Sequence, residues 1–193
     1  MNTLWKTGVV TIVLSCWVAV ASATPITCQP QNERLATLDS ATACMTGNDE
    51  NIHSPQQVSD LFGGEWVKAG ELTGNGTNGL FSVSLTSGTW GTSDVAGDWF
   101  IDSSFWSLYG MAVITMHVGQ GNGNPDYFAW AITKGETQGT FSYKDLDGKG
   151  GGLSNLFLFG GGTPAIFVPE SGLSMLFVMG LAAVFFTRRR VTH

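Results

Sequence analysis

Leu80-Phe81-Ser82-Val83-Ser84-Leu85 is the stretch of this 193-residue chain that decides its fold. Side chains of a β-strand point alternately to the two faces of a sheet, so this alternation of apolar residues with serine predicts a half-buried strand. Its apolar side chains are then expected to face a core and its serines to face solvent. The preceding stretch 74–79 contains only Gly, Asn and Thr, a composition that suits a turn.

The same signals recur along the chain on either side of this stretch. Further strands are predicted over 66–72, 99–101, 111–118, 127–133, 139–143 and 153–159, with Gly-, Asn- and Asp-rich clusters at 119–124 and 145–152. No helical period is present between these strands. Short strands in this number predict an all-β ectodomain over residues 60–164, an antiparallel β-sandwich or jelly roll.

Five tryptophans fall inside or beside the predicted strands. Large aromatic rings bury much apolar area, and a small domain needs them in its core. We therefore expect these rings to supply much of the core, while a row of exposed rings would instead form a platform for stacking sugars. The residues are Trp66, Trp90, Trp99, Trp106 and Trp130.

Residues 1–23 have the layout of a secretory signal peptide. Lys6 precedes an uncharged, mostly apolar run over 8–20, and Ala21-Ser22-Ala23 then supplies the small residues that a signal peptidase reads. Cleavage is expected between Ala23 and Thr24. An uncleaved N-terminal anchor is the alternative.

Export changes how the three cysteines are interpreted. Cys16 would leave with the signal peptide, and the remaining Cys28 and Cys44 are expected to pair in an oxidising compartment. The disulfide would pin a polar N-terminal segment, 24–59, in which we expect loops and one short helix over 33–43. A zinc site with His53 is the alternative, but two cysteines and one distant histidine fall short of the usual four ligands.

The charge of the chain lies almost entirely in its middle. Residues 24–170 hold five basic and all fifteen acidic residues, a net charge of −10. This charge argues against nucleic-acid binding, since that affinity comes largely from contacts of Lys and Arg with phosphates.

The C-terminus combines a short motif, an apolar stretch and a basic cluster. Residues 171–187 carry no charge and predict a transmembrane helix, and Arg188, Arg189 and Arg190 mark its cytoplasmic end. Val168-Pro169-Glu170 precedes the helix. With an exported N-terminus, the domain is expected outside the membrane and the arginines inside.

In this arrangement residues 168–193 resemble the PEP-CTERM sorting signal, whose motif is Val-Pro-Glu-Pro. Val168, Pro169 and Glu170 match its first three positions, and Ser171 stands where the family usually has its second proline. The resemblance implies recognition by an exosortase, a membrane-embedded cysteine transpeptidase-like enzyme that would cut near the motif and release or re-anchor the protein. It also implies a Gram-negative bacterium that makes exopolysaccharide and biofilm. A plain single-span anchor is the alternative.

Four arrangements of residues are candidate sites of chemistry. Asp145 and Asp147 alternate as in a calcium loop, but Lys149 and Leu156 replace two ligands of the EF-hand pattern, and Asp-Gly is equally a hairpin turn. Asp98 and Asp102 could form a carboxylate pair for glycoside cleavage. His117, on a predicted strand, has no nucleophile motif beside it, and the glycines of 119–123 lack the following helix that a phosphate loop needs.

The sequence therefore predicts a non-catalytic protein with no metal or other cofactor. Signal peptidase and exosortase are the expected partners, with exopolysaccharide or matrix components as candidate ligands. The protein would be anchored transiently in the inner membrane and then reach the cell surface or extracellular matrix, where it would serve adhesion or biofilm structure. A carbohydrate-binding module is the first alternative, and a secreted glycoside hydrolase or lyase the second.

Overall fold

The computed structural model describes residues 26–28, 33–48, 51–119 and 122–164. Within those ranges, strands make up most of the regular structure and two short helices interrupt them. In chain order the elements are β1 (Ile26–Thr27), β2 (Arg34–Leu38), β3 (Ala41–Gly47), α1 (Pro55–Phe62), β4 (Trp66–Leu72), β5 (Gly76–Asn78), β6 (Phe81–Ser87), β7 (Val95–Ile101), α2 (Phe105–Leu108), β8 (Met111–Gly119), β9 (Tyr127–Ile132), β10 (Gln138–Asp145) and β11 (Gly152–Gly161).

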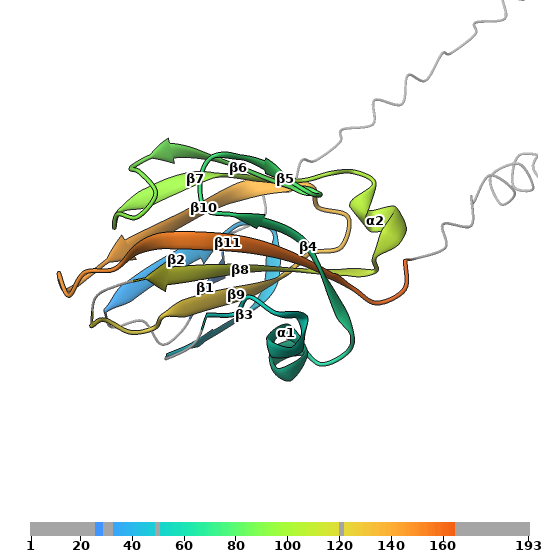
Figure 1. Cartoon of the computed structure of the whole chain (residues 1–193), viewed down its shortest axis with the longest axis horizontal. Coiled ribbons are helices and arrows are strands. Elements are labelled where there is room, and N and C mark those ends of the chain that lie inside the picture. Colours follow the sequence, from blue (N-terminus) through green and yellow to red (C-terminus); the bar gives the residue numbers. More distant parts are fainter. Residues whose placement is uncertain (1–25, 29–32, 49–50, 120–121, 165–193) are drawn as a thin grey trace, which may run out of the picture.

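The strands form two antiparallel sheets that pack face to face (Figure 1). Sheet A has the order β1-β2-β10-β7-β6-β5, and sheet B has the order β3-β9-β8-β11-β4. Every strand predicted from the sequence overlaps one of these strands. The protein is therefore an all-β antiparallel sandwich, as the alternating pattern predicted.

The core between the sheets follows from that pattern. On β6, Phe81 and Val83 are buried at 0% and 2% exposure, while Ser82 and Ser84 on the opposite face remain half-buried and exposed. Trp99 and Trp130 are fully buried, and the Trp130 ring stacks on Phe128 with centroids 5.8 Å apart.

The remaining predicted core tryptophans take less central places. Trp90 and Trp106 are half-buried and pack against the core between the sheets. Trp66 is buried in a second apolar cluster, on the outer face of sheet B. Among the described residues the core interpretation therefore holds, and the tryptophans do not form an exposed row.

Helix α1 provides a third layer over sheet B, as Figure 1 shows at the lower edge of the molecule. Val58 of α1 is fully buried in the second apolar cluster, together with Val113 and Phe159 of the sheet. Sheet B is thus covered on both faces, which explains why β8, β9 and β11 contain long buried runs instead of a clean alternation. The sequence predicts no helix over the residues of α1.

In the polar N-terminal segment, the structure differs from the sequence prediction. A helix over 33–43 is wrong, because β2 and β3 occupy those residues. Arg34, Ala36 and Leu38 are buried in alternation with half-buried Leu35 and Thr37. The period of two was hidden because the inward positions carry an arginine and an alanine in place of large apolar residues.

Several sequence predictions fall outside the described residues. They are the signal peptide with its cleavage site at Ala23 and Thr24, the motif Val168, Pro169 and Glu170, the helix over 171–187 and the cluster Arg188, Arg189 and Arg190. Over the ranges that are described, neither α1 nor α2 has the length and apolar character needed to span a bilayer.

Candidate functional site

The outer face of sheet A is polar and differs in this from the outer face of sheet B. Residues that point outward from β2, β10, β7 and β6 alternate with the buried core residues, and none of them is buried. Serine and threonine hydroxyls are the commonest polar groups among these residues, and Phe100 supplies their one aromatic ring. The outward side chains are those of Leu35, Thr37, Ser82, Ser84, Ala96, Asp98, Phe100, Gln138, Thr140, Ser142 and Lys144.

A groove of about 500 Å³ lies on this face, at the corner where β2 leaves the sheet. Pairing between β2 and β10 runs only from Phe141 onward, because the chain turns after Leu38 and crosses to β3 in sheet B. Residues 138–140 of β10 therefore lack a β2 neighbour and are paired to β7 alone. The groove is lined by Asp39, Ser40, Asp98, Phe100, Gln138, Gly139 and Thr140.

The turn that opens this corner is held by hydrogen bonds. The Asp39 carboxylate accepts hydrogen bonds from the backbone amide and the hydroxyl of Thr140, and the Asp39 amide donates to the Thr140 carbonyl at 3.0 Å. Ser40, at φ 60°, donates from its hydroxyl to Glu136 at 3.4 Å. These contacts hold one wall of the groove in place without blocking it.

Asp98 and Phe100 form the other wall and are the groups left available to a ligand. They lie two residues apart on β7, so both point to the outer face, opposite Thr140 and Gln138 of β10. Phe100 is 42% exposed. Among the described residues, no hydrogen bond or ion pair engages the Asp98 carboxylate.

Hydroxyl pairs lie on both sides of the groove along the sheet. Thr37 of β2 and Ser142 of β10 share a hydrogen bond of 2.8 Å, and Thr77 of β5 and Ser82 of β6 share one of 2.7 Å. Each hydroxyl retains capacity to accept or donate a further hydrogen bond. The polar surface therefore continues across the sheet beyond the groove itself.

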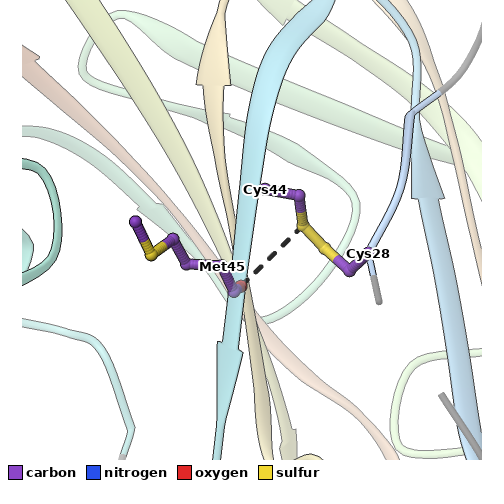
Figure 2. Close-up of a disulfide and its surroundings, with 3 residues drawn as sticks. All are labelled: Cys28, Cys44 and Met45. Atoms are coloured by element: carbon purple, nitrogen blue, oxygen red, sulfur yellow. Dashed lines mark hydrogen bonds between the residues drawn. A yellow bond between two sulfur atoms is a disulfide. The ribbon is translucent and has the colours of Figure 1, made fainter. Parts of the chain in front are cut away.

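The predicted disulfide is present between Cys28 and Cys44 (Figure 2). Cys28 directly follows β1 in sheet A and Cys44 belongs to β3 in sheet B, so the bond joins the two sheets along one edge. Their Cα atoms are 5.3 Å apart. Cys28 is 1% exposed, which shields the bond from solvent.

A charged cluster at the far end of the sheets was missed by the sequence analysis. Arg34 is fully buried, and its guanidinium donates to Asp126 Oδ1 at 2.8 Å and to the carbonyl of Gly150 at 3.0 Å. Beside it, Lys149 forms an ion pair with Glu33, and that contact lowers the pKa of the Glu33 carboxyl and raises the pKa of Lys149. The cluster fastens the β10–β11 hairpin to β2.

The stretch that was weighed as a calcium loop belongs to this hairpin. Asp145 accepts a hydrogen bond from the Gly150 amide at 2.9 Å, and Asp147 accepts one from the Lys149 amide at 3.1 Å. Lys149 also places its ammonium 3.1 Å from the Asp147 carboxylate. Within the described ranges, the two aspartates thus serve the turn, and no group of three or more metal-ligating side chains is found.

The remaining candidate residues are separate from one another. Asp102 accepts hydrogen bonds from the amide and hydroxyl of Ser104, which lower the pKa of its carboxyl, while Asp98 lies in the groove. His117 lies on sheet B, where burial lowers the pKa of its imidazole and Nδ1 is 3.1 Å from Asn155 Oδ1. His53 is exposed, ahead of α1.

Of the groove residues, sequence reasoning singled out only Asp98. Phe100 could have been found, because it is an apolar residue out of phase with the inward series Val95, Gly97 and Trp99 on the same strand. The other lining residues become neighbours only through strand register, which no local pattern encodes. In comparisons with protein-family models, with curated proteins and with solved structures, nothing matches this chain.

Proposed function

We propose that this protein is an exported, non-catalytic bacterial protein of the cell surface or extracellular matrix, with a role in adhesion or biofilm structure. The observation that carries the proposal is the disulfide between Cys28 and Cys44, which joins the two sheets. Structural disulfides form and persist in oxidising compartments outside the cytosol. A signal peptide over 1–23, cut between Ala23 and Thr24, would deliver the chain to such a compartment.

The C-terminal sequence supports sorting by an exosortase. Val168-Pro169-Glu170, the uncharged stretch 171–187 and Arg188-Arg189-Arg190 are the three parts that the PEP-CTERM resemblance requires. In this proposal the uncharged stretch spans the inner membrane as a single helix until the enzyme cuts near the motif. The sandwich is then released or re-anchored outside the cell.

A carbohydrate-binding role is the second candidate, and the outer face of sheet A favours it. That face combines an exposed ring at Phe100 with the carboxylate of Asp98 in one groove. The two candidates are compatible, since a matrix protein needs a matrix ligand. Cleavage of glycosides by Asp98 and Asp102 is not favoured, because Asp102 is engaged by Ser104 at the start of α2.

Sorting can be tested by intact mass. The full gene is expressed in a host with an exosortase and in a matched strain without it, and the extracellular protein is weighed. We expect a species that starts at Thr24 and ends near Glu170, and only where the enzyme is present. A species that keeps Arg188 to Arg190 and stays membrane-bound in both strains would make the protein a simple tail-anchored ectodomain.

A paired variant sharpens this experiment. Replacing Pro169 and Glu170 with alanine should leave the full-length chain in the inner membrane of the exosortase host. Alanine substitution of Lys144 and Glu65, which are exposed and lie on the sandwich, provides the control and should not change release. Release of the Pro169/Glu170 variant at the normal level would count against processing at this motif.

A further inference from the structure

The groove on sheet A offers two complementary chemical groups side by side. The Phe100 ring presents an apolar surface, 42% exposed, near the end of β7 on a face that is otherwise mainly polar. The half-buried carboxylate of Asp98 lies two residues away on the same strand and face. An exposed aromatic ring beside convergent polar groups is a usual composition for a small-ligand site.

A sugar ring matches both groups at once. One face of a pyranose is made of C–H groups and packs on an aromatic ring, while its rim carries hydroxyl donors. A carboxylate accepts two such hydrogen bonds, and charge assistance makes each of them stronger than a neutral one. Gln138, opposite Phe100 in the strand register, adds an amide that both donates and accepts.

The charge of the groove distinguishes between uncharged and anionic sugar polymers. The groove residues include two carboxylates, Asp39 and Asp98, and no basic side chain. The sequence from 24 to 170 carries a net charge of −10. Both facts oppose a polymer of uronate, sulfate or phosphate groups, because like charges brought together in an interface are repelled. An uncharged sugar meets no such penalty.

The extent of the polar face favours a polymer over a single sugar. The hydroxyl pairs Thr37–Ser142 and Thr77–Ser82 lie on either side of the groove, on strands β2 and β10 and on strands β5 and β6. A chain of sugar units that crosses the strands would meet a hydroxyl pair on each side of Asp98 and Phe100. Hydrogen bonds already formed within the pairs orient these groups before a ligand arrives.

We propose that this groove binds an uncharged polysaccharide, with Phe100 stacking on a sugar ring and Asp98 accepting hydrogen bonds from its hydroxyls. The inference deepens the proposed matrix role, since it names the ligand class that would hold the protein in the matrix. It can be tested on purified protein, independently of export and tail processing. Failure of sorting therefore leaves it untouched, and failure of binding leaves the sorting proposal untouched.

The test is affinity electrophoresis of the full-length chain in a polyoxyethylene detergent, which carries no sugar headgroup. Native gels contain dextran, laminarin or galactomannan as neutral probes, alginate as an anionic probe and chitosan as a cationic probe. We expect at least one neutral probe to retard the protein and alginate to have no effect. Retardation by none of the neutral probes, or by chitosan alone through ion exchange, would overturn the proposal.

Variants then locate the site. Phe100→Ala and Asp98→Asn should each weaken binding about tenfold or more, a loss of about 1.4 kcal/mol, and Phe100→Trp should retain it. Met45→Ala is the matched control, because Met45 is also 42% exposed but lies on β3 in the other sheet. Asp60→Asn, on α1, is the control for the charge change.

Unfolding midpoints in urea separate lost binding from lost structure. Each variant is measured alongside the parent chain, and Phe100→Trp serves as a second readout if Phe100→Ala unfolds. Unchanged binding by a folded Phe100→Ala or Asp98→Asn, or equal losses in the Met45→Ala and Asp60→Asn controls, would place the ligand elsewhere and overturn the assignment.

Discussion

At the scale of single residues, the buried Arg34 is the side chain on which the far end of the sandwich depends. Its guanidinium is 0% exposed and binds Asp126, whose side chain is 28% exposed. Removing one member of a buried pair leaves the other uncompensated and typically costs 3–5 kcal/mol. Since Asp126 keeps some contact with water, we expect Arg34→Met to lower the free energy of unfolding by about 3 kcal/mol, measured by urea titration.

A surface ion pair provides the control for this prediction. Lys68 and Glu71 are 2.9 Å apart but 35% and 43% exposed. Exposed pairs contribute less than about 1 kcal/mol, so Lys68→Met should change the unfolding free energy little. If the two substitutions lowered the unfolding free energy equally, burial of Arg34 would add nothing to the stability of the protein.

His117 gives the protein a pH dependence that can be assigned to one side chain. Burial lowers the pKa of its imidazole in the folded state. As pH falls below about 6.5, the unfolded chain therefore takes up a proton that the folded chain resists, and the folded state loses stability. We expect the unfolding free energy to fall between about pH 7 and 5, and His117→Gln to flatten that slope.

Several charged and polar groups around His117 also affect its protonation, and a variant of the exposed His53 serves as the control. Asn155 hydrogen-bonds the ring, Asp126 favours its protonation, and Arg34 and His53 oppose it. The effect of His53 on His117 is the smallest of these, so His53→Gln should keep most of the slope of the parent chain. The pKa values of Glu33 and Asp102 are also lowered, so a further loss below about pH 4.5 should persist in both variants. If His117→Gln kept a steep slope of unfolding free energy against pH, that slope would come from another group.

At the scale of elements, α1 depends on a cap that is visible in the sequence. Ser54 accepts from the Gln57 amide, Gln57 reaches back to the Ser54 amide at 3.1 Å, and Pro55 opens the first turn. This reciprocal pattern satisfies two free amides of the helix start. We expect Ser54→Ala to destabilise the protein by about 1 kcal/mol and Ser54→Asp to retain stability, both by urea unfolding. Equal stability of the alanine variant would show that α1 unfolds apart from the sandwich.

The individual helices and strands differ in how well the sequence predicts them. The strands with clean alternation, such as β6, were predictable, because a half-buried strand has a period of two. Helix α1 was missed although Ser54 and Gln57 form a capping box, and β2 was missed because Arg34 takes an inward position. The groove could not be predicted from the sequence, since it exists only where the strand register places Asp98 opposite Thr140 and Phe100 opposite Gln138.

At the scale of the whole molecule, the disulfide is the covalent link between the two layers. β1 contains only two residues and pairs with β2 at the edge of sheet A, so few hydrogen bonds hold it. Cys28, directly after β1, is tied to Cys44 on β3 at the edge of sheet B. The same bond therefore fixes a short edge strand and holds the two sheets together at that edge.

The size of this effect follows from the length of chain that the bond closes. Cys28 and Cys44 are 16 residues apart, a separation for which loop-closure entropy predicts about 3 kcal/mol. We expect Cys28→Ala/Cys44→Ala to lose about that much unfolding free energy, measured by urea titration of the full chain. Reductant should destabilise the parent chain similarly and leave the double variant unchanged. If reductant destabilised both equally, its action would lie outside the disulfide, and the bond between the sheets would not limit stability.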